Sequence, residues 1–504
     1  MNLRAMLGIL FCVFISGASF AVKFTSVESY IQAQSLIRVA MDDAQGFGDI
    51  VASVNMMDDL RKYGFQGTFE VIYPDASANK LAMLFGLPDT LPAVYEDTRD
   101  KIRFMKFSEF KHRANNHLLD KAGLGITGAL FESSGTWQPL LADKNNLATA
   151  LNVEKFIWLN PWLEKMYGNQ VYSIDQASPQ VIDNADTFIT MPVATLQQTK
   201  DYLLHDPNGQ ALLAKNPGMQ TLMGAIETQH INFFAVYGWT ITKRFNQEYE
   251  HDSSPGNILQ VILGARYAEL NGPAAYRNKP LVIAVFYDYH EEMAQLQKDI
   301  YSANWGSDEI SGASQARDAI KKLGLAAPGV FIMASLSDPN TASIISQLKA
   351  GQILLLSMGA LPKIVFDGLY TQTGPNIWPP LREGPNSFDS LILSGKPHFR
   401  CGNTASGPLR WERGYDEIPD TAFRQRLKDF YDPEGTSPDN NQKHFCHGIH
   451  TWEQRGDIAE IYGQFIIDAD DPGSGISRYF QALKRSAEDK ENDRLYRVLE
   501  TALP

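Results

Sequence analysis

The chain is poor in cysteine and in positive charge, and each shortage excludes a class of protein. Only 3 of its 504 residues are cysteine, which excludes a disulfide-dense scaffold. Lys and Arg number 45 against 58 Asp and Glu, so the formal net charge is −13. Nucleic-acid-binding domains usually have a basic surface and a high pI, so this balance argues against a nucleic acid as partner. The chain also lacks the Gly-x-Ser-x-Gly elbow of α/β-hydrolases and the Walker A loop of P-loop NTPases.

Long apolar runs are also missing, except at the N-terminus. Arg4 supplies a positive charge, Ala5 to Ile15 form a short apolar segment, and Ser19-Phe20-Ala21 has the small-x-small pattern of a cleavage site. The apolar run is short for a membrane span, and we expect no other transmembrane segment. The pattern predicts a signal peptide over residues 1–21 and export to the periplasm or the medium. The alternative is an uncleaved N-terminus that anchors the protein in a membrane.

The cysteines that remain after such a cleavage are few. Cys12 lies inside the apolar segment, which leaves Cys401 and Cys446 in the mature chain. In an oxidising compartment these two thiols can form a disulfide. Two separate buried thiols are the alternative, because spacing in the sequence says nothing about the geometry of a bridge.

Apolar runs of strand length alternate with segments of helical periodicity along most of the chain. Hydrophobic residues make up 44% and charged residues 20%, an ordinary globular composition. Strand, helix and strand at this spacing predict parallel sheets with helices on both faces. In a first series we predict strands at 36–41, 69–73, 102–107, 126–131, 156–159 and 187–191. In a second series we predict them at 233–237, 281–287, 330–334, 353–357, 363–366 and 397–401. The predicted helices are 49–60, 258–270, 291–300, 314–323 and 341–348.

Two such series predict an α/β protein with two Rossmann-like domains that face each other across a cleft. A length of 504 residues also favours two or three domains. We place the N-terminal Rossmann-like domain at 22–225, the C-terminal one at 226–475 and a terminal helix at 476–504.

The first candidate site is the segment Asp42-Asp43-Ala44-Gln45-Gly46-Phe47-Gly48-Asp49-Ile50. It follows the first predicted strand and opens a helix. Gly46 and Gly48 let a ligand approach the backbone, and a helix N-terminus favours an anionic or hydroxyl-rich ligand. Carboxylates such as Asp43 and Asp49 would lie at the carboxyl edge of the sheet, where ligands bind in open α/β folds. The alternative is a tight turn in which Asp49 caps the helix.

The second candidate site is Arg382-Glu383-Gly384-Pro385-Asn386-Ser387, which precedes a predicted helix over 388–393. A helix that starts after Gly384 can bind a phosphate, and Arg382 can add a charge-assisted hydrogen bond. The Glu383 carboxylate can accept hydrogen bonds from ribose or sugar hydroxyls. The alternative is a surface loop with a solvated ion pair.

A third cluster consists of His444, Cys446, His447 and His450. Three histidines and a cysteine within seven positions resemble a metal site. No HExxH-type general base accompanies them, and the cysteine is needed elsewhere if it forms a disulfide. A polar surface segment is therefore the favoured interpretation, and we predict no metal site.

The first two segments together resemble the ligand-binding segments of GT-B glycosyltransferases. Gly46-Phe47-Gly48-Asp49-Ile50 is similar to the N-terminal loop that faces the acceptor in that class. The segment 382–387, with Gly395-Lys396-Pro397-His398-Phe399, is similar to the loop and helix that grip the nucleotide sugar. The pairing is most similar to the bacterial protein-arginine rhamnosyltransferases, which share an Asp-rich Gly-Asp-Ile turn and an Arg-Gly-Glu-Asp-Ser segment. In this chain the Glu follows the Arg directly, and Gly-Pro-Asn precedes the Ser.

This resemblance implies a sugar transfer from a nucleotide-sugar donor, or a lipid-linked one, to a protein or glycan acceptor. Asp43 or Asp49 would be the general base. Arg382 and the helix start after Gly384 would stabilise the departing diphosphate, and Glu383 would orient the ribose or the sugar. Asn386 and Ser387 belong to the same donor segment. The resemblance implies no metal and no cofactor besides the donor.

Two other functions fit a two-domain exported protein. A periplasmic-type solute-binding protein also has two α/β lobes with a ligand between them, and it binds without turnover. A GT-B-like epimerase or hydrolase would use the same cleft for different chemistry. Nucleotide sugars are cytosolic, so export fits a glycosyltransferase only with a lipid-linked donor, a cytosol-facing anchor or action inside a host cell.

Overall fold

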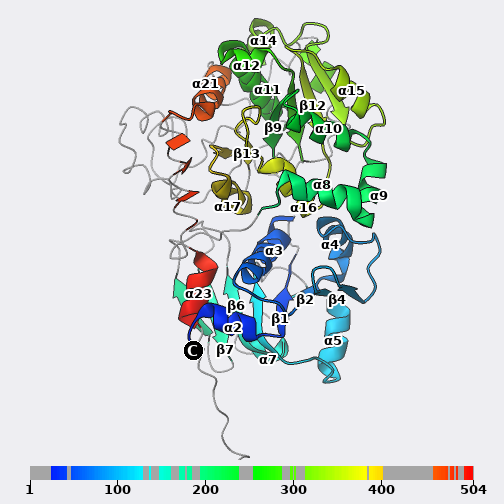
Figure 1. Cartoon of the computed structure of the whole chain (residues 1–504), viewed down its shortest axis with the longest axis vertical. Helices are drawn as coiled ribbons and strands as arrows, with labels where there is room; N and C mark the ends of the chain where they lie inside the picture. Colours follow the sequence, from blue (N-terminus) through cyan, green and yellow to red (C-terminus); the bar gives the residue numbers. More distant parts are fainter. Residues whose placement is uncertain are drawn as a thin grey trace, which may run out of the picture.

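Two β-sheets form the framework of the protein in this computed structural model, one above the other along its long axis (Figure 1). The structure describes residues 24–42, 47–128, 136–137, 147–159, 170–175, 179–183, 193–237, 254–286, 296–298, 300–301, 313–382, 385–400, 458–474, 477–478, 480–481, 484–485, 488 and 493–502. The predicted signal peptide lies outside these ranges. Among the described residues, no helix combines the length and the apolar character that a membrane span requires.

The first sheet has strand order β3-β4-β2-β1-β5-β6-β7-β8. The neighbours from β4 to β6 run parallel, whereas β3, β7 and β8 pair antiparallel with their neighbours. The parallel centre agrees with the predicted strand-and-helix alternation, which did not include the antiparallel edges. The strands are β1 (Leu36–Ala40), β2 (Thr68–Tyr73), β3 (Val94–Asp97), β4 (Ile102–Lys106), β5 (Ala122–Thr127), β6 (Val153–Leu159), β7 (Gln170–Asp175) and β8 (Pro179–Asp183).

Helices cover both faces of the first sheet because its central strands are apolar on both sides. On one face, Ile37 and Val39 of β1 pack in a core with α2, α3, α4 and α23. On the other face, Ala40 packs with α5 and α7. We call this sheet and its helices the first unit. Its helices are α2 (Val27–Ala33), α3 (Phe47–Lys62), η1 (Asp75–Ser77), α4 (Ala78–Leu84), α5 (Phe107–Asn115), α7 (Leu147–Ala150) and α23 (Arg494–Ala502).

The second sheet has the order β11-β12-β10-β9-β13-β14, and all of its neighbouring strands are parallel. Its central strands are buried along their whole length, as parallel strands between two helical layers should be. The strands are β9 (Asn232–Val236), β10 (Leu281–Val285), β11 (Phe331–Ser335), β12 (Ile353–Ser357), β13 (Leu381–Arg382) and β14 (Phe399–Arg400).

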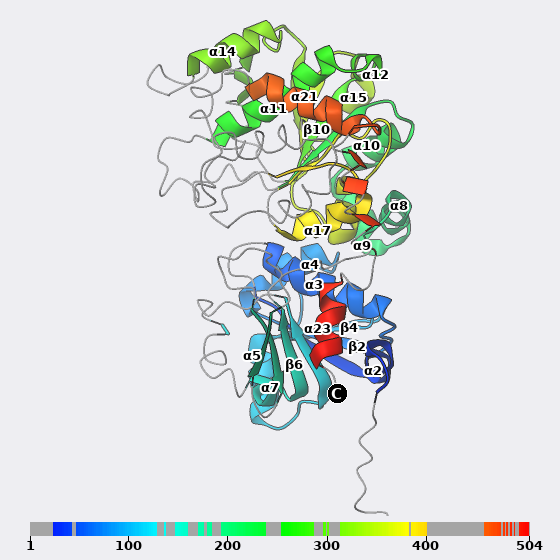
Figure 2. The ribbon, with the colours of Figure 1, turned by 90° about the vertical axis from the view of Figure 1, so that its left-hand side faces the viewer.

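The second unit consists of this sheet and the helices in its cores. On one face, α11 and α21 lie side by side although they are far apart in the sequence (Figure 2). On the other face, α10 and α15 pack against each other. The helices are α8 (Leu196–His205), α9 (Pro207–Lys215), α10 (Gly218–Glu227), α11 (Ser254–Asn271), α12 (Ala274–Arg277), α14 (Ala313–Lys322), α15 (Thr341–Gln347), α16 (Lys363–Tyr370), α17 (Pro385–Ser394) and α21 (Ile458–Asp470).

The chain crosses between the units more than once. Helices α8 and α9 precede the predicted boundary at residue 225 and α10 spans it, but all three pack in a core of the second sheet. The last helix, α23, returns to the first unit and lies beside α2 (Figure 1), where Tyr496 donates a hydrogen bond from its hydroxyl to Glu28. The boundary between the domains therefore stays a prediction, while the membership of each core is clear.

The segment 363–366 is the clearest error in the predicted secondary structure, because it is the start of α16 and not a strand. Pro362 lies at its N-cap, where a residue without an N–H removes one of the donors that a helix start leaves without a partner. Val365, Leu369 and Tyr370 are buried at helical spacing, and the three apolar residues that follow Lys363 are too few to reveal that period. The predicted strand at 187–191 lies outside the described residues, as does most of the predicted helix at 291–300.

Gly86 marks a close approach of the two units. Its φ is +61°, and a Cβ there would lie 2.0 Å from the hydroxyl oxygen of Tyr202 on α8. Gly86→Ala would therefore add a steric collision to the cost of a left-handed backbone, which is about 1–2 kcal/mol. Gly324, at φ +67° with nothing within 4 Å of a Cβ, is the matched control. In urea denaturation we expect Gly86→Ala to destabilise the protein more than Gly324→Ala, and equal losses would contradict the contact.

Candidate active site

Among the described strands, each sheet has a topological switch point. In the first sheet the chain places β2 and β4 on one side of β1 and then β5 on the other side. In the second sheet it places β10 on one side of β9 and later β13 on the other. Ligands of open α/β sheets bind at the carboxyl edge of such a point, where loops diverge to opposite faces and leave a crevice. The fold therefore defines an α/β protein with two candidate edges, one beside β1 and β5 and one beside β9 and β13.

The first edge is closely packed at the ends of β1 and β5, next to the first predicted segment. Asp42, which follows β1, is 2% exposed, and the indole N–H of Trp137 donates to the Met41 carbonyl over 2.9 Å. After β5, the Gly128 N–H donates to Ser53 Oγ of α3 over 2.9 Å. A Cβ on Gly128 would lie 2.5 Å from the α3 backbone, so only glycine lets β5 end this close to the helix. The position of α3 is thus tied to the end of β5.

The first predicted segment opens α3. The helix begins at Phe47, so Gly48 and Asp49 lie in its first turn at the carboxyl end of β1. Asp43 and Gly46 lie outside the described residues, as does the side chain of Asp49. The backbone therefore puts the segment at the first edge, and the role of each carboxylate stays a prediction.

The second predicted segment surrounds the start of α17. Arg382 ends β13, and Asn386 and Ser387 lie in the first turn of α17, which begins at Pro385. Glu383 and Gly384, between these elements, lie outside the described residues, as do the side chains of the other three. The predicted donor segment is therefore at the carboxyl edge of β13, next to the end of β9, where Leu381 is the registered partner of Val236.

The pairing of β13 with β14 brings one further residue to this edge. Arg400 of β14 is the registered partner of Arg382, so the two backbones are neighbours across the parallel pair. Arg400 was not predicted from the sequence as a site residue, because the order of strands beside β13 cannot be derived from the sequence. Its position immediately after the segment 395–399 was the available signal.

The remaining predicted residues lie outside the described part of the chain. This holds for Cys401 and Cys446, and for the three histidines His444, His447 and His450. Within the part that the structure describes, no three His, Cys, Asp or Glu side chains are grouped as a metal site would require.

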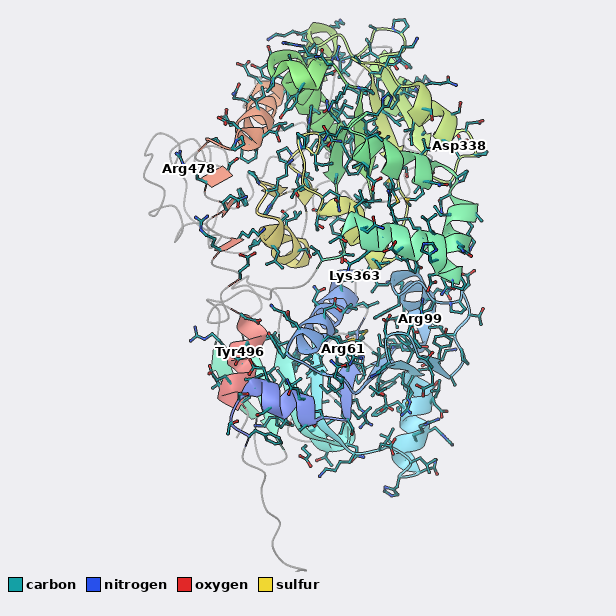
Figure 3. All side chains as sticks on the ribbon, viewed as in Figure 1. Arg61, Arg99, Asp338, Lys363, Arg478 and Tyr496 are labelled. Atoms are coloured by element: carbon teal, nitrogen blue, oxygen red, sulfur yellow. The ribbon has the colours of Figure 1, made fainter. Side chains whose placement is uncertain are left out.

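Helices from the two candidate edges meet. Helix α3 of the first unit contacts α17 of the second, so the elements that carry the two predicted segments lie against each other (Figure 1). Several charged contacts also join the two units. Arg99 forms an ion pair with Asp206 at the N-cap of α9, and Lys363 of α16 lies on the same boundary (Figure 3).

Lys363 is the centre of a charged cluster that is largely buried on the α16 side. Its side chain is 13% exposed, and its Nζ lies 2.5 Å from Asp367 Oδ2 and 3.7 Å from Asp58 Oδ2 of α3. Burial raises the pKa of Asp58 to about 6, and the nearby Lys363 ammonium opposes that shift. Burial also raises the pKa of Asp100 in the same region. The cluster therefore combines one ammonium with carboxylates from both units.

This charged cluster was not predicted from the sequence. Lys363 and Asp367 stand four residues apart, which is the spacing of an ion pair on a helix. Because the segment was predicted as a strand, that spacing had no meaning. Asp58 is distant in sequence, and only the packing of α3 against α16 brings it within reach.

Comparisons with known proteins give weak likenesses only. No family model matches the chain, and no curated protein matches it in sequence. An α-glucosyltransferase solved with UDP and a 13-mer DNA is 9% identical, with a TM-score of 0.32 over 93% of this chain and 95% of that chain. The N-terminal domain of trehalose-6-phosphate phosphatase from Candida albicans is 7% identical, with a TM-score of 0.32 over 93% of this chain and 96% of that chain. A UDP-forming trehalose-phosphate synthase from Burkholderia vietnamiensis is 9% identical, with a TM-score of 0.25 over 90% of this chain and 98% of that chain.

Scores this low carry no information about activity.

Proposed function

We propose that the protein is a glycosyltransferase that takes a sugar from a nucleotide-sugar donor, with its chemistry between the two candidate edges. The observation that carries this proposal is the contact between α3 and α17. Both helices start at the carboxyl edge of a switch point, and each carries one of the segments that resemble GT-B glycosyltransferases. A two-substrate transfer needs its donor and acceptor sites to be adjacent, and this arrangement meets that need.

The donor would lie on the second unit. The first N–H groups of a helix have no partner within the helix, and they lie at the positive end of its dipole, so the N-terminus of α17 suits a diphosphate. Arg382 and Arg400, neighbours in the sheet, are the cations expected to compensate the negative charge that develops on the leaving group. Glu383 would hold the ribose or the sugar. This set of charges performs the stabilising role without requiring a metal.

The acceptor would lie on the first unit. A hydroxyl or an amide-like nitrogen becomes a nucleophile as its proton is removed, and Asp43 or Asp49 would take that proton. The new bond joins the acceptor atom to the anomeric carbon, the bond to the diphosphate oxygen breaks, and the diphosphate leaves with the electron pair. The narrower resemblance to the arginine rhamnosyltransferases, and the export of the protein, stay predictions.

A thermal-shift screen against nucleoside diphosphates and nucleotide sugars tests the proposal. A bound nucleotide stabilises the fold by RT ln(1 + [L]/Kd), which is about 2.7 kcal/mol at a hundredfold excess over Kd. We expect one base to raise the melting temperature and Glu383→Ala to remove that rise. Glu488→Ala, which removes an exposed carboxylate paired with Lys484 in the second unit, is the matched control and should keep it.

The outcomes separate the rival functions. If no nucleotide shifts the melting temperature but a free sugar or amino acid does, the protein is a solute-binding protein. If a nucleotide binds and Glu383→Ala binds it equally well, the donor site lies elsewhere. If the donor sugar is released to water or epimerised without an acceptor, the protein is a hydrolase or an epimerase.

A further inference from the structure

The contact between Asp58 and Lys363 joins the two units through α3, the helix that begins at the first candidate edge. Asp58 lies on α3, whose first turn carries Asp49. Lys363 opens α16, which follows the carboxyl end of β12 in the second sheet. Their charged atoms are 3.7 Å apart. Figure 3 shows Lys363 on the boundary, above the helix of the first unit that also carries Arg61. Any change in the spacing of the two units therefore changes this contact.

The charges around the contact do not cancel without the lysine. Asp367 on α16 has a side chain that is 6% exposed, and it lies 2.5 Å from Lys363 Nζ. Asp58 faces the same ammonium from the first unit, and its side chain is 37% exposed. Asp100 adds a further negative charge near Asp58, whereas Arg61 of α3 interacts attractively with both carboxylates. Bringing Asp58 and Asp367 together is therefore favourable only while an ammonium separates them.

We infer that Lys363 is a positioning residue that holds the first and second units at their observed spacing by neutralising Asp58 across the boundary. This inference rests on the proposed function, because in a glycosyltransferase the spacing of the units sets the distance between donor and acceptor. Lys363 acts through α3 and α16, and it need not touch either substrate.

Loss of the ammonium should push the units apart in a pH-dependent way. In Lys363→Met, ionised Asp58 and Asp367 repel each other, so the boundary opens above the pKa of Asp58. Burial already raises that pKa to about 6 in the native chain, where Lys363 opposes the shift, so without the lysine it rises further. Protonation at pH 5 removes one of the two negative charges, and the boundary should close again.

Hydrogen exchange of the full chain, expressed as protection factors, reports this opening without any substrate. At pH 8 we expect Lys363→Met to lower protection in α3 and α16 about tenfold or more, and to leave β10 unchanged. Lys363→Arg keeps the cation and should behave as wild type. Adding Asp58→Asn to Lys363→Met removes the repulsion and should restore protection in α3.

Lys396→Met is the matched control. Lys396 is also largely buried and paired, with its Nζ 3.5 Å from Asp470 Oδ1, but both partners belong to the second unit. Its loss should lower the melting temperature without changing protection in α3. If Lys363→Met does not fold, Asp58→Lys on the more exposed side of the contact places two cations across the boundary and should also expose α3.

The inference is overturned if Lys363→Met leaves α3 protection within about twofold of wild type at pH 8. It is also overturned if Asp58→Asn fails to restore protection in the double variant, or if Lys396→Met exposes α3 to the same extent. These results are separate from nucleotide binding. If a variant opens the boundary but keeps the nucleotide-induced thermal shift, both proposals are supported. If a variant opens the boundary but the wild-type protein binds no nucleotide, only the proposed function is overturned.

Discussion

Replacing Glu70 with alanine is expected to lower the free energy of unfolding by about 3–5 kcal/mol. Glu70 is buried in the first sheet, where its carboxylate accepts a hydrogen bond from Arg38 Nε over 2.7 Å and one from Arg103 Nη1 over 3.1 Å. The Arg38 side chain is fully buried and also donates to the carbonyls of Leu151 and Asp120. Removing the carboxylate leaves the Arg38 charge buried without its counter-ion, and that is the source of the large cost.

A double variant separates the ion pair from packing. Arg38→Met with Glu70→Leu removes both charges and should cost less than Glu70→Ala alone, because no charge is left uncompensated. Glu154→Ala, which breaks an exposed pair with Lys121, is the control and should change stability by less than about 1 kcal/mol. Urea denaturation measures all three. A loss below about 1 kcal/mol for Glu70→Ala would show that the buried charge is compensated by other groups.

The second large effect is expected at the predicted general base. Asp43→Asn or Asp49→Asn, whichever residue is the base, should reduce turnover by about 10²–10⁴-fold and leave the nucleotide-induced thermal shift intact. An amide has nearly the shape of the carboxylate but cannot accept the proton, so binding and chemistry are affected separately. The measurement is the release of nucleoside diphosphate from the donor identified by the thermal-shift screen.

Asp89→Asn is the control for this experiment. Its side chain is 91% exposed and pairs with Lys215 across the boundary between the units. It should turn over at the wild-type rate, which excludes a general effect of lost charge on the first unit. If neither Asp43→Asn nor Asp49→Asn lowers turnover by about tenfold, the proton is taken by another group and the base assignment is wrong.

Much of the local structure could be predicted because the strands carry their own signal. The second sheet is the clearest case, since β12 has the predicted bounds and β10 and β11 are within two residues of theirs. Continuous runs of Ile, Leu and Val mark strands that are buried on both faces. The run at 363–366 was wrong because four residues are too few to separate a strand from one turn of a helix.

The candidate site could be predicted only in part, for a different physical reason. Turns rich in glycine and carboxylates can be located from the sequence, and the structure puts the helices that follow them at the carboxyl edges of two switch points. Which edges meet depends on packing between distant segments. Helix α23 shows this, because it packs in a core of the first unit, whereas α21, which precedes it in the chain, packs in a core of the second.

The amino-acid sequence by itself determined the α/β class, the order of most strands along the chain and the two turns that contain candidate catalytic or binding residues. These follow from local periodicity and from backbone freedom at glycine. Only the tertiary structure decided that β13 lies beside β9, that Arg400 is the neighbour of Arg382, and that Lys363 meets Asp58. Strand order within a sheet and charge pairing between helices are set by contacts between residues far apart in the chain. Local sequence contains no record of which distant partner will be there.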